Sequence, residues 1–313
     1  MVIKMINDIW NGSIFEMVIG IGPNTVKAGG DCALPFLRDE DAQPVKPVTA
    51  LEVWDVEPRE WSDVLTGAFP GVLHDPAAWA KKCAQYGADL ISLKLAGTHP
   101  DLGDASPEQA AAIAKEVAAA VEIPLIVTGC GIEEKDALTL PVVARALSGR
   151  NVLIGSATAN NYKDIAAACI EYGHNIIANS PLDINLAKQL NILISEMNLP
   201  LHRIAMDPLV GSLGYGIEYA YSIMERSRLG ALNGDKMLSM PIICFVGQEA
   251  WKTKEANSPE NMAWGDLKRR AVLWEAITAS TLAQAGGSIF VLRHPESLKQ
   301  FKVHIESMTA LNI

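Results

Sequence analysis

Hydrogen-bonding side chains recur in this sequence directly after short apolar runs. Asn179 follows the run at residues 175–178, and Asp207 follows the run at residues 203–206. The asparagine amide donates and accepts hydrogen bonds and the aspartate accepts them, so the two can bind amide groups or ring nitrogens of an organic ligand. Because Asp207 precedes a proline, a role as a turn former is equally open for it.

Other candidates follow the remaining runs, and they combine small residues with polar ones: Thr98, His99, Gly129, Gly211, Gly214 and Gly216. The glycines within residues 210–216 give a weak signal for a phosphate cradle, and close approach of the backbone to a large planar ligand explains them equally well. His99 has no second histidine at metal-ligand spacing, so a structural or solvent-facing role is the more common outcome. Cys130, beside Gly129, is more often a small buried thiol than a reactive thiolate.

Eight apolar runs alternate with longer segments of helical period. They lie at residues 51–54, 89–93, 124–127, 152–154, 175–178, 203–206, 241–245 and 288–291. This alternation indicates βα units around a parallel sheet, whose strands are buried on both faces and therefore almost wholly apolar. The 266 residues from 48 to 313 give about 33 residues per unit, close to what a βαβ repeat requires.

The even spacing predicts a single (β/α)8 barrel of the TIM type over residues 48–313. An open, doubly wound sheet would also alternate strand and helix. Such a sheet reverses its strand order near the middle, and the sequence gives no signal of a reversal, which favours the closed barrel. Residues 1–47 precede the repeats as an extension, in which residues 15–21 and 24–27 predict a hairpin that seals the lower end of the barrel. Function in such barrels lies on the loops after the carboxyl ends of the strands, so the candidate residues would share one mouth.

Helix starts are marked by capping residues. Ser106 with Gln109 predicts a capping box, and Asp75, which is followed by a proline, predicts a second cap. Ser180, also followed by a proline, repeats the pattern after the fifth run. Each cap would begin a helix soon after a strand, as a βα unit requires.

Composition and charge limit the classes of protein to consider. A net charge of −10 and the lack of a basic patch argue against nucleic-acid binding. No apolar run approaches the roughly 20 residues of a membrane helix and no secretion signal is evident, so we expect no membrane association and a cytoplasmic location. The five cysteines are scattered without a C-x-x-C pair, which argues against an iron–sulfur cluster held by this chain alone.

Six segments of the barrel resemble the delta subunit of the acetyl-CoA decarbonylase/synthase system, which is the small, barrel-forming subunit of the corrinoid iron–sulfur protein. They include ALEVWDVEP at residues 50–58, DPLVGSLGYGIEY at residues 207–219 and GQEAWKTK at residues 247–254. The others lie at residues 75–83, 93–100 and 180–191. Together the segments span nearly the whole predicted barrel.

The resemblance implies a heterodimer of the reductive acetyl-CoA pathway, in which a large corrinoid and iron–sulfur subunit holds the cobalamin and this barrel covers its upper face. The implied role is that of a methyl carrier between a methyltetrahydrofolate methyltransferase and acetyl-CoA synthase, rather than that of a self-sufficient enzyme. A movable cover would shield the cobalt from water and oxidants. The implied cofactor-binding residues are Thr98, His99, Gly129, Asn179, Asp207, Gly211, Gly214 and Gly216, with no catalytic residue and no metal ligand in this chain.

Three other functions stay open on the sequence. A pterin-binding methyltransferase barrel would bind methyltetrahydrofolate itself, with Asp55, Asn179 and Asp207 hydrogen-bonded to the pterin edge. A scaffolding barrel without an active role is a second alternative. A lyase or aldolase in which Lys94 forms a Schiff base is a third.

Overall fold

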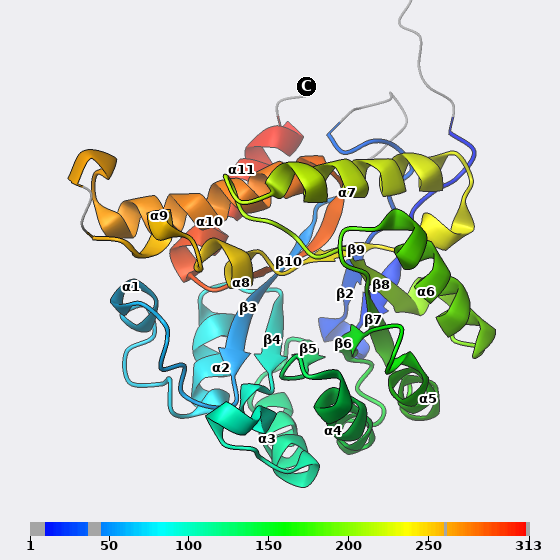
Figure 1. Ribbon diagram of the computed structural model, residues 1–313, viewed down its shortest axis with the longest axis horizontal. Helices are drawn as coiled ribbons and strands as arrows, with labels where there is room; N and C mark the ends of the chain where they lie inside the picture. Colours follow the sequence, from blue (N-terminus) through cyan, green and yellow to red (C-terminus); the bar gives the residue numbers. More distant parts are fainter. Residues whose placement is uncertain (1–9, 37–44, 260–261, 311–313) are drawn as a thin grey trace, which may run out of the picture.

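Eight short parallel strands close into a ring at the centre of the molecule (Figure 1). The computed structural model describes residues 10–36, 45–259 and 262–310. Around the ring the strands are β3 (Val48–Trp54), β4 (Leu90–Lys94), β5 (Leu125–Thr128), β6 (Leu153–Ala157), β7 (Asn175–Asn179), β8 (Ile204–Asp207), β9 (Ile242–Cys244) and β10 (Gly287–Leu292). The ring is completed where β10 pairs with β3, with Ile289 opposite Val48. Each of the eight predicted runs forms one of these strands.

Helices follow the strands and surround the ring (Figure 1). The longer ones are α2 (Pro76–Gln85), α3 (Pro107–Ala120), α4 (Glu133–Ala146), α5 (Tyr162–Tyr172), α6 (Ile184–Glu196), α7 (Ile217–Leu232), α10 (Leu267–Gln284) and α11 (Pro295–Ala310). Three short ones are α1 (Asp63–Thr66), α8 (Val246–Ala250) and α9 (Lys254–Asn257). This arrangement confirms the predicted TIM barrel. Within the described ranges no helix has both the length and the apolar character needed to cross a membrane.

Two of the three predicted helix caps are confirmed and one is wrong. Ser106 and Gln109 form the capping box of α3, and Asp75 accepts a hydrogen bond from the backbone at the start of α2. Ser180 caps no helix, because Leu182 has a left-handed backbone with φ of 46° that prevents α6 from starting there. Asp183 caps α6 instead, and its carboxylate accepts hydrogen bonds from two backbone N–H groups.

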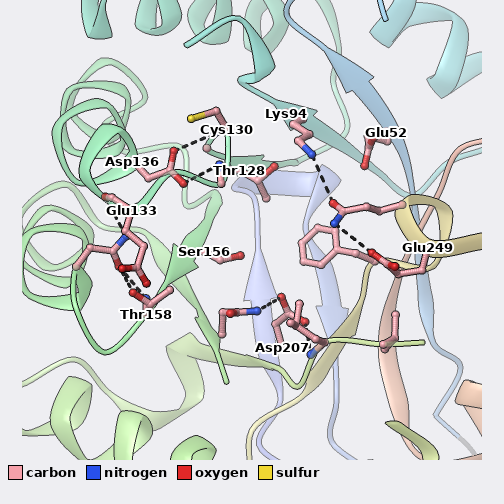
Figure 2. Close-up of a pocket in the computed structure, with 18 residues that line it drawn as sticks. Glu52, Lys94, Thr128, Cys130, Glu133, Asp136, Ser156, Thr158, Asp207 and Glu249 are labelled. Atoms are coloured by element: carbon pink, nitrogen blue, oxygen red, sulfur yellow. Dashed lines mark hydrogen bonds between the residues drawn. The ribbon is translucent and has the colours of Figure 1, made fainter. Parts of the chain in front are cut away.

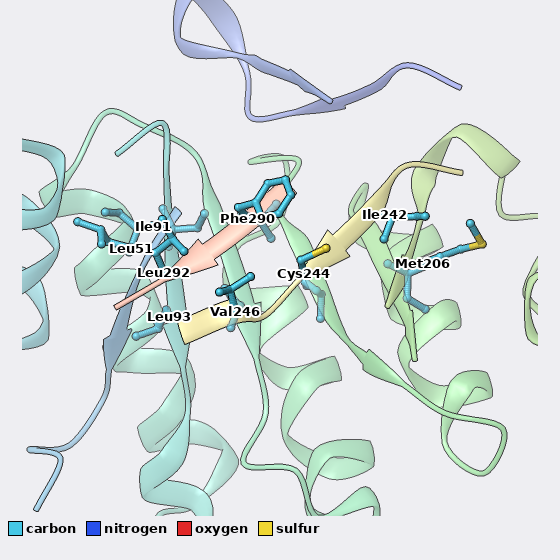
Figure 3. Close-up of a cluster of buried hydrophobic side chains, with 14 of the residues drawn as sticks. Leu51, Ile91, Leu93, Met206, Ile242, Cys244, Val246, Phe290 and Leu292 are labelled. Carbon is cyan, nitrogen blue, oxygen red and sulfur yellow. The ribbon is translucent and has the colours of Figure 1, made fainter. Parts of the chain in front are cut away.

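The apolar side chains of the strands alternate between two buried layers. On β4, for example, Ile91 belongs to the layer between the ring and the helices, whereas Leu90 belongs to the layer inside the ring. Figure 3 shows part of the outer layer, in which Leu51, Cys244 and Phe290 project from neighbouring strands. With both faces covered, the ring is rigid and holds the strand ends at fixed positions.

An antiparallel hairpin closes the end of the ring at which the strands begin. It consists of β1 (Met17–Ile19) and β2 (Val26–Ala28), and Met17 is fully buried in the layer inside the ring. The side-chain amide of Asn175, the first residue of β7, donates a hydrogen bond to the carbonyl of Val18 at 2.9 Å. The predicted hairpin is therefore confirmed, and it seals this end of the barrel. The opposite end stays open to ligands.

The hairpin is expected to contribute stability through its buried side chains. Met17→Ala should lower the free energy of unfolding by about 2–5 kcal/mol, because it leaves a cavity inside the ring. Val18→Ala, on the same strand but pointing to solvent, should change it by less than about 0.5 kcal/mol. Urea denaturation of both variants measures the difference. Equal losses of unfolding free energy would contradict the proposal that the hairpin fills this end of the ring.

Candidate functional site

A polar cavity of about 250 Å³ lies at the mouth of the barrel, where the strands end (Figure 2). Its walls come from segments far apart in the sequence, which the ring brings together. They include the ends of β4, β5, β7 and β8 and the short helix α8. Leu209, Val210 and Phe245 add an apolar part to an otherwise polar lining.

Asn179 and Asp207 form a hydrogen-bonded pair in the wall of this cavity. Each is the last residue of its strand, and they are direct partners in the register of β7 and β8. The Asn179 side-chain N–H donates to Asp207 Oδ2 at 2.8 Å, and the backbone N–H of Leu209 donates to Asp207 Oδ1 at 3.0 Å. Both predicted residues therefore line the cavity, and Asp207 also has the turn-forming role that its position before a proline allows.

Burial makes the carboxyl group of Asp207 a weaker acid than usual. Its removal from water raises the pKa of the carboxyl group from 3.8 to about 6, although the hydrogen bonds from Asn179 and Leu209 act in the opposite direction. Because the folded-state pKa lies above that of an unfolded chain, the fold binds this proton more tightly, and the group's stabilising effect is lost as the pH rises through 6. The site therefore presents a carboxyl group that changes charge close to neutral pH.

A buried cluster of charges occupies another side of the cavity. Glu52 Oε1 accepts hydrogen bonds from Trp54 at 2.6 Å and from Arg293 Nε at 2.9 Å, and its distance to Arg293 Nη2 is 2.8 Å. Burial alone would raise the pKa of Glu52, but Arg293 and Lys94 outweigh it and the pKa is lowered. Burial lowers the pKa of Lys94, and Glu52 counteracts part of that shift. Glu52 is thus held ionised by Arg293, with Lys94 at the cavity wall.

Gly129 lines the cavity because a larger residue would not fit there. A Cβ atom at this position would lie 2.0 Å from a carboxylate oxygen of Asp136. That carboxylate accepts hydrogen bonds from the backbone N–H groups of Cys130 at 2.8 Å and Gly131 at 3.0 Å. The Cys130 thiol is half-buried, and burial raises its pKa. The glycine therefore permits a tight turn that is stabilised by Asp136.

Thr98 and His99 lie outside the cavity, although both follow β4. Thr98 is fully buried and donates its hydroxyl hydrogen to the carbonyl of Leu95 at 2.8 Å. His99 Nδ1 accepts a hydrogen bond from the backbone of Asp101 at 3.1 Å. Asp55, which the pterin alternative assigns to the ligand, accepts a hydrogen bond from the backbone of Gly97 at 2.8 Å, and its burial raises its pKa to about 6. All three stabilise the loop beside the cavity.

The predicted glycines of the loop after β8 form its backbone rather than the cavity lining. A Cβ atom at Gly211 would lie 2.6 Å from the carbonyl carbon of Gly216, so the loop closes tightly on itself. Gly214 and Gly216 have left-handed backbones, with φ of 74° and 87°. The first residues of the same loop, Leu209 and Val210, do line the cavity. The loop therefore rises from the edge of the mouth.

Most residues of the cavity wall are absent from the sequence-based set of site residues, among them the charged Glu52, Lys94 and Asp136. Glu52 had a usable signal, since a charged residue inside an apolar strand is rare unless it is paired. Lys94 ends a strand but was considered only as a Schiff-base former. Asp136 lies in the first turn of a helix, where acidic residues are common because they interact favourably with the helix dipole. Within the described residues, no cluster of three or more His, Cys, Asp or Glu side chains could hold a metal ion.

Comparison with known proteins shows the family to which this chain belongs. A family model described as the CO dehydrogenase/acetyl-CoA synthase delta subunit matches residues 16–299. The chain belongs to this family. It is 36% identical over 284 residues to the acetyl-CoA decarbonylase/synthase complex subunit delta of Methanocaldococcus jannaschii, an alignment that covers 88% of this chain and 68% of that one. The resemblance inferred from the sequence is thereby confirmed.

Two further members of the family show similar overlap. Subunit delta from Archaeoglobus fulgidus is 36% identical over 306 residues, which cover 93% of this chain and 67% of the relative. The subunit from Methanothermobacter thermautotrophicus is 35% identical over 301 residues, which cover 95% and 76%. The present chain thus spans about two thirds to three quarters of the length of these relatives.

Solved structures with the same fold include dihydropteroate synthases. The Xanthomonas albilineans enzyme with 4-aminobenzoic acid matches with a TM-score of 0.58 at 14% identity, over 85% of this chain and 93% of that one. The same enzyme with 7,8-dihydropteroate gives 0.56, over 85% and 95%. At such low identity the likeness shows a shared barrel fold.

The pKa of Asp207 should respond to its hydrogen-bond partner. Asn179→Ala removes an N–H that favours the carboxylate, so the pKa should rise above its value in the unmodified chain, which is about 6. Asn161→Ala is a matched control, because Asn161 also lines the cavity but is hydrogen-bonded to Thr158. Carbon-13 NMR titration of labelled aspartates measures both shifts, and the same pKa in both variants would refute the pairing.

Proposed function

We propose that this chain is the barrel subunit of a heterodimeric corrinoid iron–sulfur protein, and that its mouth covers the cobalamin of a larger partner subunit. In this role the heterodimer carries a methyl group from methyltetrahydrofolate, through a methyltransferase, to acetyl-CoA synthase. The observation that supports the proposal is the mouth itself, where separate strand ends present hydrogen-bonding groups around one open cavity in a member of the delta-subunit family. Membership of a multi-subunit complex is in keeping with the names of the relatives.

The residues of the mouth fit the edge of a corrinoid rather than its whole ring. A corrin macrocycle is much larger than a cavity of about 250 Å³, so the ring would lie over the mouth and only its amide arms would enter. Asn179 and Ser156 line the cavity with groups that hydrogen-bond amides (Figure 2). Cβ atoms added at Gly214 and Gly216 would contact aromatic side chains, Trp274 at 3.8 Å and Tyr219 at 3.6 Å, so the loop backbone lies beside aromatic surface that a flat ligand could share.

Apolar side chains beside the cavity would be covered by the same arrangement. Leu209, Tyr215 and Tyr219 are exposed on and just after the loop that follows β8. Exposed apolar groups that gather at one place commonly mark an interaction surface. When bound, the cobalamin would supply the cobalt that accepts and releases the methyl group. The residues of this chain would bind its periphery and exclude water from the covered face.

A substitution in the mouth tests this proposal in the assembled complex. Asn179→Ala should slow methylation of the corrinoid about tenfold, because loss of a hydrogen bond to a buried partner costs about 1–3 kcal/mol. Asn233→Ala is the control, since Asn233 lies exposed at the end of α7, away from the cavity. Stopped-flow absorbance of the corrinoid gives the rate. Unchanged methylation and unchanged corrinoid retention in Asn179→Ala would overturn the proposal.

The size of the cavity favours a second candidate, in which the barrel binds a pterin itself. A cavity of this volume accommodates a two-ring heterocycle, and the side-chain oxygens of Asn179 and Asp207 can accept hydrogen bonds from its amino and ring N–H groups. The two candidates are compatible if the methyl donor binds below the corrinoid. Calorimetric titration of the full chain with methyltetrahydrofolate tests the second candidate: micromolar binding that Asp207→Ala weakens supports it, and absence of binding excludes it.

A further inference from the structure

We infer that Lys94 recognises a ring carbonyl of the ligand, and that the cavity takes a neutral planar heterocycle whose carbonyl meets Lys94 while its N–H edge meets Asp207. This inference rests on the second candidate function above. It names the chemical class of ligand and the residue that selects it.

The Lys94 ammonium is poorly satisfied within the chain. Among the described residues no carboxylate oxygen lies within 4.0 Å of it, and its one hydrogen bond, to Gln248 Oε1, is long at 3.5 Å. It also lies 5.3 Å from the ring centre of Trp54. A lysine carries three N–H donors, so at least two remain available for an acceptor in the cavity.

The nearby carboxylate of Glu52 does not fill this role, because it lies more than 4.0 Å from the Lys94 ammonium and forms its ion pair with Arg293. Its Oε1 atom is bonded to both Arg293 and Trp54, and the side chains of Glu52 and Arg293 are almost completely buried. Burial also lowers the pKa of Lys94, which is the behaviour of an amine whose charge is incompletely compensated. A ligand oxygen at Lys94 would therefore supply the close hydrogen-bond acceptor that the described residues lack.

Lys94 and Asp207 face the cavity from opposite sides of the barrel. Lys94 is the last residue of β4 and Asp207 the last residue of β8, and these strands are four places apart in the ring of eight. Figure 2 shows the two side chains reaching the same cavity from different walls. A flat molecule that spans the mouth would thus meet a donor at one end and the paired Asn179 and Asp207 at the other.

The charge of the lining restricts the ligand further. Five carboxyl groups line the cavity, from Glu52, Glu133, Asp136, Asp207 and Glu249. Lys94 is the one cationic side chain among the described residues of that lining. A phosphate or another multiply charged anion would be repelled, whereas a neutral molecule with N–H donors would be favoured. A heterocycle that combines an amino-substituted N–H edge with a ring carbonyl meets both requirements.

Two probes that differ at the ring carbonyl test the role of Lys94. The full chain is titrated calorimetrically with 6-methylpterin, which has the ring carbonyl, and with 2,4-diamino-6-methylpteridine, in which an amino group replaces it and the adjacent ring nitrogen loses its hydrogen. We expect the unmodified chain to bind the carbonyl compound at least about tenfold more tightly, because the amino group would place a donor against a donor. Lys94→Met should reduce this preference, because only the contribution of the adjacent ring N–H remains, and Lys115→Met, at an exposed site on α3, should retain it in full.

The outcomes separate this inference from the function on which it rests. Equal affinities of the unmodified chain for the two probes would overturn the role of Lys94 and leave pterin binding standing. Failure of both probes to bind would overturn pterin binding and the role of Lys94 together. Equal affinities of the unmodified chain would overturn the role of Lys94 even if Lys94→Met does not fold.

Discussion

The ion pair between Glu52 and Arg293 joins the first strand of the barrel to the segment after the last strand. Its two side chains are 3% and 8% exposed, and charges so buried are tolerated only when paired and hydrogen-bonded. Trp54 donates a further hydrogen bond to Glu52, and Glu275 accepts one from the Arg293 backbone at 2.6 Å. The pair thereby links the first strand to the end of the last one at the end of the ring where the cavity lies.

This closure decides both the shape and the charge of the mouth. Because the ring is closed and its other end is filled by the hairpin, strand ends from distant parts of the sequence face one cavity. Because Glu52 forms its ion pair with Arg293, the Lys94 ammonium keeps N–H donors available at the cavity wall. Across the ring, burial raises the pKa of Asp207 to about 6. A rigid scaffold thus holds two unlike polar groups at a fixed separation, as ligand recognition requires.

Periodicity and turn residues predicted the barrel, its eight strands and the hairpin, because these depend on local patterns of apolar residues. Asn179, Asp207 and Gly129 could be placed in the cavity from their positions at strand ends. Thr98 and His99 occupy similar positions but turn away, since the short helix Ala96–Thr98 buries the threonine, and sequence spacing does not reveal such a turn. The role of Asp136 was equally hidden, because its contacts with Cys130 and Gly131 arise only from the folded backbone.

The central claim is that the mouth of the barrel faces the cobalamin of a partner subunit. A fluorophore attached at Leu209→Cys would lie at the mouth, whereas one at Val18→Cys would lie at the hairpin end, both in a chain whose exposed Cys32 and half-buried Cys130 are replaced by serine. Since corrinoids absorb visible light, bound cobalamin quenches a nearby dye by energy transfer. The account predicts strong quenching at position 209 and weak quenching at position 18 when the cobalamin-loaded partner is added, and equal or reversed quenching would contradict it.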